Sequence, residues 1–278
     1  MGKGKPNQNN FLQKKSILKR ISERHSKLFD DSLALVIVGK HAERTKPDKE
    51  LNAQGVGQSY WSGAHLPRDM ELIVRASPIQ RSMETGRRAE MAYKGDKKSE
   101  VNIKQDFMKY VFDVLGEIYE PGKQTFSELV AVGKQYFRVQ FPEILSRIAN
   151  IQMTRRPLYY NVSHEGMETA ILGALGFTEK DLELLFPKRT PSKTDKSADF
   201  KFGRTEGILF YFQKDLNGKY KIIMSFRRQR FDITGRVNNI LNDPKSKKEQ
   251  YEFYIDMSKR YPQFTDAYIN YANTFLDR

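Results

Sequence analysis

The sequence predicts an α/β protein, with three α/β/α layers, a mostly parallel central sheet and an inserted helical cap. Short apolar runs rich in Val, Ile and Leu recur along the chain, as in strands that are buried on both faces. Segments of helical periodicity alternate with these runs up to about residue 93, which is typical of α/β folds. From about residue 94 to residue 150 a polar loop and two helical segments interrupt this alternation and suggest the cap.

Each predicted element has a local signal. The expected strands are residues 33–38, 71–76, 158–162, 206–213 and 219–227. The expected helices are residues 52–63, 78–93, 106–119, 126–151 and 166–175. Asn52 is a suitable N-cap for the first of these helices, and Pro78 stands near the start of the second, where a missing N–H costs little. Asp215-Leu216-Asn217-Gly218 predicts a hairpin between the last two strands.

Changes of composition divide the chain into three parts. Residues 1–30 are expected to form a basic N-terminal extension, partly disordered or helical. Residues 31–230 hold the α/β domain, with the helical cap at about 94–150. Residues 231–278 are expected to form a C-terminal helical extension that packs on this domain.

The composition limits the kinds of partner. Among 278 residues, 48 Lys and Arg outnumber 34 Asp and Glu, so the formal charge of +14 attracts anions. The chain has no cysteine, which excludes disulfides and thiolate metal sites and fits a reducing compartment. With no secretory signal and no apolar run of about 20 residues, a cytoplasmic protein without a transmembrane segment is expected. We find no nucleic-acid-binding motif and expect no specific nucleic-acid partner.

Polar residues follow three of the predicted strands. His41 comes shortly after the first strand, Arg81 after the second and His164 after the third. In an open α/β sheet, ligands bind at the carboxyl ends of the strands. If these strands are neighbours, the three side chains converge on one site.

Histidine and arginine at such a site suit phosphoryl transfer. An imidazole nitrogen can attack phosphorus and hold the phosphoryl group covalently until water removes it. Arg44 and Arg81 can bind the phosphoryl oxygens in pairs, and His164 can donate a further hydrogen bond. Glu165 is the first candidate for the acid that protonates the leaving oxygen. Alternative acids remain open, namely Glu117, Glu120 and Glu168. This chemistry requires no metal and no cofactor.

Several segments resemble the histidine phosphatase superfamily, and its acid phosphatase and phytase branch more than its phosphoglycerate mutase branch. Lys40-His41-Ala42-Glu43-Arg44-Thr45 is similar to the family's Arg-His-Gly-x-Arg motif. Ser77–Thr85 resembles the segment that supplies a second pocket arginine, and His164-Glu165 resembles the later motif of histidine and acid. The paired strands from Glu206 to Arg227 also resemble that branch.

The resemblance implies a role for each motif residue. His41 is the nucleophile and Glu165 the proton donor. The groups that bind phosphate are Lys40, Arg44, Arg81 and His164. Two positions depart from the motif, because Lys40 lacks the bidentate fork of arginine and Ala42 replaces glycine. The resemblance therefore implies a phosphomonoester hydrolase acting on a phosphorylated small molecule. A non-catalytic phosphate-binding protein of the same fold and a nucleic-acid-binding protein are the alternatives, and the sequence predicts no oligomeric state.

Overall fold

A computed structural model describes residues 30–40, 42, 50–77, 80–95, 126–149, 155–163, 166–185, 207–227 and 229–243, with isolated positions at 248, 251, 252, 255 and 259. The elements are, in chain order, β1 (Ala34–Lys40), α2 (Ala53–Ala64), β2 (Met70–Ala76), α3 (Gln80–Lys94), α5 (Phe126–Ala149), β3 (Arg156–Ser163), α6 (Met167–Ala174), α7 (Glu179–Leu185), β4 (Gly207–Lys214), β5 (Tyr220–Phe226), β6 (Gln229–Asp232) and α8 (Thr234–Asn242).

Within the described residues, six strands form one sheet in the order β2-β3-β1-β4-β5-β6. Strands β2, β3 and β1 are parallel, whereas β4, β5 and β6 join antiparallel to the β1 edge. The α/β class is therefore confirmed. The expectation of a mostly parallel sheet holds for only three of the strands, since the predicted hairpin extends the same sheet in antiparallel fashion.

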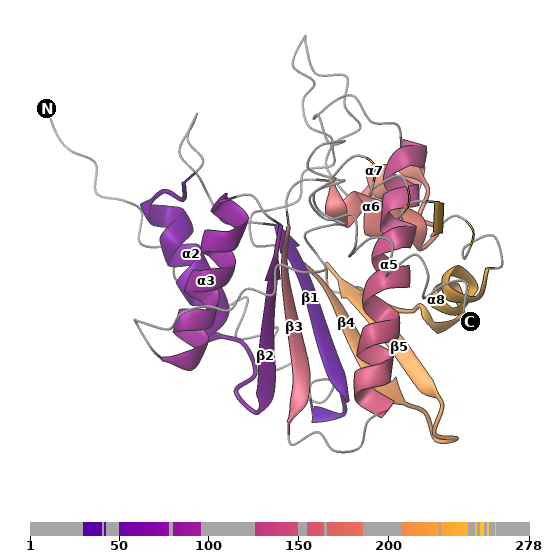
Figure 1. Ribbon diagram of the computed structural model, residues 1–278, viewed down its shortest axis with the longest axis horizontal. Coiled ribbons are helices and arrows are strands. Elements are labelled where there is room, and N and C mark those ends of the chain that lie inside the picture. Colours follow the sequence, from indigo (N-terminus) through magenta and orange to yellow (C-terminus); the bar gives the residue numbers. More distant parts are fainter. Residues whose placement is uncertain are drawn as a thin grey trace, which may run out of the picture.

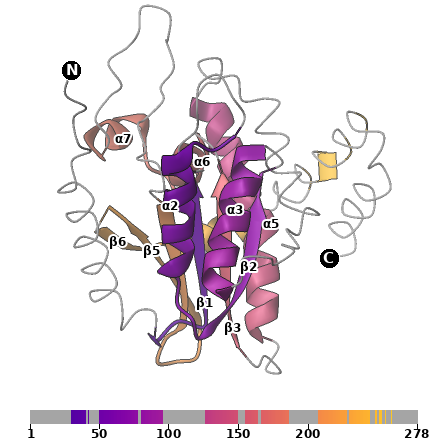
Figure 2. The ribbon, with the colours of Figure 1, turned by 90° about the vertical axis from the view of Figure 1, so that its left-hand side faces the viewer.

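The sheet lies between two helical layers. Helices α2 and α3 cover one face, and α5 lies along the other face with α6 and α8 beside it (Figure 1). The view turned by 90° has α2 and α3 in front of the sheet and α5 behind it (Figure 2). The three-layer arrangement is thus confirmed.

Strand β1 is central and apolar on both faces. Val36 and Val38 are fully buried in the cluster that includes α5, whereas Leu35 belongs to the cluster on the opposite side. On the α5 side the core is aromatic, and the Phe141 ring lies 5.1 Å from that of Phe212 and 5.4 Å from that of Phe210, between ring centroids. An apolar run of this kind is what a strand covered on both faces requires.

The helix predicted over 126–151 is confirmed as α5, which continues through Pro142. It packs on the sheet, so this part of the segment expected as a cap contributes to a helical layer; residues 96–125 lie outside the described residues. Helix α8 buries Val237 and Ile240 in the same core, in the region expected as a helical extension. No described helix has both the length and the hydropathy to cross a membrane.

Candidate active site

The carboxyl ends of β1, β3 and β2 lie next to one another. Lys40, the last residue of β1, pairs in register with Ser163, the last residue of β3. Ala76 at the end of β2 pairs with Val162, and the N–H of Ser77 donates to the Val162 carbonyl at 3.0 Å. The carboxyl ends of the three strands that precede the predicted site residues therefore lie side by side at the same end of the sheet.

Most of the predicted site residues are outside the described part of the chain. These residues are His41, Arg44, His164 and Glu165, and the side chain of Lys40 is also outside it. Their places in the sequence still relate them to the sheet, because His41 is the next residue after Lys40 and His164 the next after Ser163. Lys40 and Ser163 are themselves neighbours across β1 and β3.

Arg81 is described, and it lies in the first turn of α3 as a half-buried side chain. The helix begins three residues after Ser77, so Arg81 follows directly from the carboxyl end of β2. The Thr85 hydroxyl, one turn further on, donates to the Arg81 carbonyl at 2.7 Å. The same hydroxyl accepts a hydrogen bond from the N–H of Ala42 at 3.1 Å. Thr85 thus joins the residue after His41 to the turn that presents Arg81.

A second anchor lies one residue away on α3. The Glu84 carboxylate accepts from the N–H of Leu51 at 3.3 Å and from the Arg88 guanidinium at 2.9 Å. Ala42 and Leu51 stand on either side of residues 43–49, which include Arg44. Both ends of this connection between β1 and α2 are therefore fastened to α3.

Helix α2 begins with the cap that the sequence predicts. The side chain of Asn52 accepts from the N–H of Gly55 at 2.8 Å, which satisfies one of the free donors at the helix start. The cap fixes where the helix starts, directly after the Leu51 anchor. The prediction made from Asn52 is confirmed.

The turn after β3 depends on a glycine. Gly166 precedes α6 and has a φ of 97°, a left-handed conformation that residues with a side chain rarely adopt. This turn follows His164 and Glu165 directly. Glu168, the alternative acid, lies in the first turn of α6 and is fully buried. Glu117 and Glu120 lie outside the described residues.

Two buried hydroxyl groups lie close to Arg81 in the sequence. Ser77 and Ser82 have no exposed surface, and among the described residues neither side-chain oxygen has a hydrogen-bond partner. Burying an unsatisfied hydroxyl is costly, which is why such groups are usually bonded to protein, water or ligand. Sequence reasoning assigned no role to these serines or to Thr85, although all three lie in the Ser77–Thr85 motif.

The α5 side of β3 carries a further polar pair. The Asn161 amide donates to the Tyr136 hydroxyl at 3.1 Å, and burial raises the pKa of Tyr136 although this hydrogen bond opposes the shift. Tyr136 therefore stays neutral in the ordinary pH range and acts as a hydrogen-bonding group. No group of three or more His, Cys, Asp or Glu side chains within the described ranges is placed to hold a metal ion.

The chain was compared with protein families, curated proteins and solved structures. No family model and no curated protein matches the chain. Solved structures similar to it include a phosphoserine phosphatase from Entamoeba histolytica (15% identity, covering 68% of this chain and 94% of that one, TM-score 0.37). Others are a mycobacterial glucosyl-3-phosphoglycerate phosphatase (13%, 69% and 97%, 0.41) and a Hafnia alvei phytase (11%, 70% and 84%, 0.38).

Proposed function

We propose that the chain is a metal-independent phosphomonoesterase of the histidine phosphatase type, with His41 as its nucleophile. The observation that supports this most is the double hydrogen bond of Thr85, which ties Ala42 to the turn of Arg81. These bonds hold Ala42, the residue next to the proposed nucleophile, against α3, which carries the proposed phosphate-binding Arg81. The pairing of Lys40 with Ser163 gives further support, because His41 and His164 follow these two residues.

In the proposed reaction, an imidazole nitrogen of His41 attacks phosphorus while the bond from phosphorus to the ester oxygen breaks. Glu165 donates a proton to the departing oxygen. Water then attacks the phosphohistidine, Glu165 accepts its proton, and inorganic phosphate leaves as the N–P bond breaks. The non-bridging oxygens are held by charged donors, whose bonds are roughly twice as strong as neutral ones. These donors are Lys40, Arg44, Arg81 and His164.

The substrate class follows from charge. A formal charge of +14 favours an anionic, phosphorylated small molecule over a neutral one. We assign the choice among such substrates to two segments. Residues 43–49 follow β1 and precede α2 in the sequence, and residues 96–125 belong to the stretch that interrupts the predicted α/β alternation. Residues 1–30 and 231–278 are proposed to flank the catalytic domain.

The role of Glu165 is tested by the leaving group. A nitrophenolate leaves without protonation, whereas an alkoxide requires an acid. Glu165→Gln should therefore slow hydrolysis of an alkyl phosphate by ~10²-fold or more and that of nitrophenyl phosphate much less. Glu168→Gln is the matched control. If that variant shows the selective loss instead, Glu168 is the acid.

The nucleophile is tested by trapping the intermediate. The protein is mixed with a ³²P-labelled aryl phosphate, and the reaction is stopped without acid, because acid hydrolyses phosphohistidine. After digestion, the label should be on the peptide that contains His41. His41→Ala should carry none and should still fold. Label on another peptide would contradict the proposal.

A second candidate function rests on Lys40. Lysine keeps the charge of the expected arginine but cannot form two parallel hydrogen bonds to a phosphate. A non-catalytic phosphate-binding protein would bind vanadate or phosphate and never form the labelled intermediate. In that case Lys40→Arg should strengthen phosphate binding without creating turnover.

A further inference from the structure

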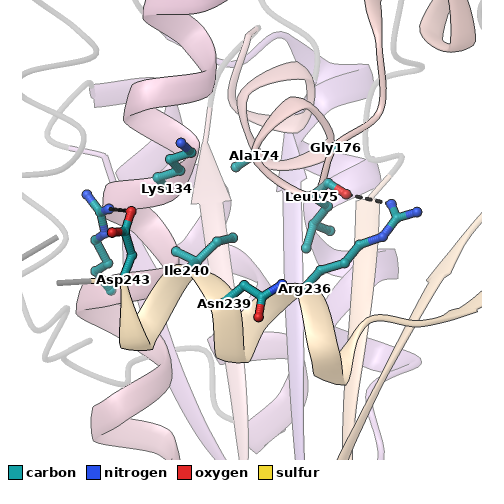
Figure 3. A pocket seen from close by; sticks show the side chains of 9 residues that line it. Lys134, Ala174, Leu175, Gly176, Arg236, Asn239, Ile240 and Asp243 are labelled. Atoms are coloured by element: carbon teal, nitrogen blue, oxygen red, sulfur yellow. Dashed lines mark hydrogen bonds and ion pairs between the residues drawn. The ribbon is translucent and has the colours of Figure 1, made fainter. Parts of the chain in front are cut away.

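A cleft lined by three cations lies at the carboxyl end of α6. The cleft, of about 440 Å³, opens where α5, the end of α6 and α8 meet (Figure 3). Its cations are Lys134 and Arg138 from α5 and Arg236 from α8, and Asp243 is the one acid among the lining residues. Ala174 and Ile240 contribute apolar wall. Clefts of a few hundred Å³ with an apolar wall and a few charged groups are typical of small-molecule sites.

Two of the cations that line the cleft come from α5. Lys134 and Arg138 are four residues apart and so lie on the same face of the helix, where like charges repel. Arg138 is 4% exposed, and its guanidinium lies 4.0 Å from the Asp243 carboxylate. Taking a cation out of water is costly even when an acid is near. An anion in the cleft would offset both effects.

Arg236 adds a third cation from across the cleft. Its guanidinium donates to the Leu175 carbonyl at 2.5 Å (Figure 3). It also lies over the Phe177 ring, 5.5 Å from the ring centroid. These contacts hold the side chain at the carboxyl end of α6 and use one of its five N–H donors. The remaining donors can serve a ligand. With Asp243 offsetting one cation, the lining retains an excess of positive charge.

We propose that this cleft binds a phosphorylated small molecule, with its phosphate at Lys134 on the α5 side of the cleft (Figure 3). A volume of about 440 Å³ exceeds that of inorganic phosphate, so the ligand would carry an organic part against Ala174 and Ile240. Asn239 lies exposed at the rim, where its amide can bond a polar group of that part.

The cleft is separate from the proposed active site. His164 and Glu165 come just before α6, whereas Ala174, Leu175 and Gly176 line the cleft at its end. Eight residues of helix span about 12 Å at 1.5 Å per residue. This inference does not depend on the proposed catalysis, because a cleft ligand can bind whether or not His41 is a nucleophile.

The absence of cysteine allows a position-specific test. Asn239→Cys would carry the sole thiol, and an environment-sensitive dye there would report on the cleft. Phenylphosphonate is a suitable probe, since it is a dianion with an apolar ring and no ester bond to hydrolyse. We expect a saturable fluorescence change at constant ionic strength, and a weaker one with inorganic phosphate, which lacks the organic part.

Two further variants decide the result. Adding Lys134→Ala to the labelled Asn239→Cys protein should lower the affinity for phenylphosphonate about tenfold or more, because a charge-assisted hydrogen bond is lost. Lys219→Ala removes the same charge from the exposed β4–β5 turn and should change affinity by less than about twofold. Calorimetry on the unlabelled wild-type and Lys134→Ala proteins should show the same weakening of one binding event. No saturable signal, or equal affinity in the Lys134 and Lys219 variants, would overturn the proposal.

Discussion

Thr85 joins two backbone segments that lie far apart in the sequence. Its hydroxyl uses its one donor on the Arg81 carbonyl and accepts from the N–H of Ala42. Thr85 and Ala42 are both fully buried, so water cannot replace either bond. A single hydroxyl therefore fixes how far Ala42, at the start of the connection from β1 to α2, lies from α3, the helix that carries Arg81.

Thr85→Val keeps the shape of this side chain and removes both hydrogen bonds. Because the buried N–H of Ala42 would lose its hydrogen bond to the Thr85 hydroxyl, the free energy of unfolding should fall by about 1–3 kcal/mol in urea denaturation. Turnover of an aryl phosphate should fall as well. Thr85→Ser retains the hydroxyl and should recover most of both losses. Equal activity in Thr85→Val and wild type would show that this anchor does not position the site.

Asp232 gives a pH prediction at the residue scale. Burial opposes ionisation of this carboxyl, but hydrogen bonds from Thr234 and the ion pair with Lys221 at 3.4 Å prevail and lower its pKa. A pKa lower in the folded state means that the stabilisation is present above the unfolded pKa of about 4. It is lost as the pH falls through the folded pKa.

Melting temperatures measured from pH 7 to pH 2.5 should reveal this linkage. Asp232→Asn should melt below the wild type at pH 5–7, and the gap should close as the pH falls below about 4. Asp215→Asn, in the exposed turn, has no ion pair with a described cation and serves as the control. A gap that is independent of pH would contradict the assignment to the carboxylate charge.

At this scale the sequence singles out residues whose motif is local, and it gives no sign of residues whose contacts depend on the tertiary fold. His41, His164 and Arg81 were identifiable because each follows an apolar run. Thr85 and Glu84 could not be given roles, since their partners, Ala42 and Leu51, are brought near only by the packing of α3.

Helices α2 and α3 touch through a glycine. A Cβ at Gly63 would lie 1.8 Å from the Ala89 carbonyl oxygen, so the two backbones approach more closely than any side chain permits. Gly57, on the same helix, would meet nothing within 4 Å. The close approach places α3 against α2. Helix α3 carries Thr85 and Glu84, which hold the two ends of the connection from β1 to α2.

Gly63→Ala should therefore destabilise the protein, by about 1–3 kcal/mol or more, because the helices must separate. Gly57→Ala is the matched control and should stabilise the protein by up to about 1 kcal/mol, since alanine favours a helix more than glycine. Chemical denaturation of both variants measures the difference. A Gly63→Ala protein as stable as Gly57→Ala would refute this description of the interface.

Elements with a strong local signal were predictable from the sequence and the weak ones were not. Strands β1, β2 and β3 each contain a short apolar run, and each was expected within about two residues of its observed bounds. Strand β6 has four residues and one half-buried side chain, so it lacks an alternating pattern. It forms because its backbone pairs with β5, which is a tertiary cause.

At the scale of the whole molecule, the net charge of +14 should act on substrate capture. Electrostatic attraction of an anion weakens as salt shortens the Debye length from about 30 Å at 0.01 M to about 8 Å at 0.15 M. The value of kcat/KM for an aryl phosphate should fall over this range through KM, with kcat little changed. Steady-state kinetics at several concentrations of NaCl test this prediction. A KM that does not change with the salt concentration would contradict it.

The order β2-β3-β1 is the whole-molecule feature that the sequence could only suggest. Convergence of the three polar motifs required these strands to be neighbours, and the parallel pairs β1–β3 and β2–β3 confirm that they are. The antiparallel half of the sheet was not predicted, because a hairpin signal specifies the pairing of two strands and not the edge they join.

The most direct test is hydrolysis of an aryl phosphate between pH 4 and pH 8, with a metal chelator present, by the wild type and by His41→Ala. We expect turnover in the wild type that survives the chelator and disappears in the variant, while circular dichroism shows that both proteins are folded. Turnover retained by His41→Ala would contradict phosphoryl transfer through this histidine.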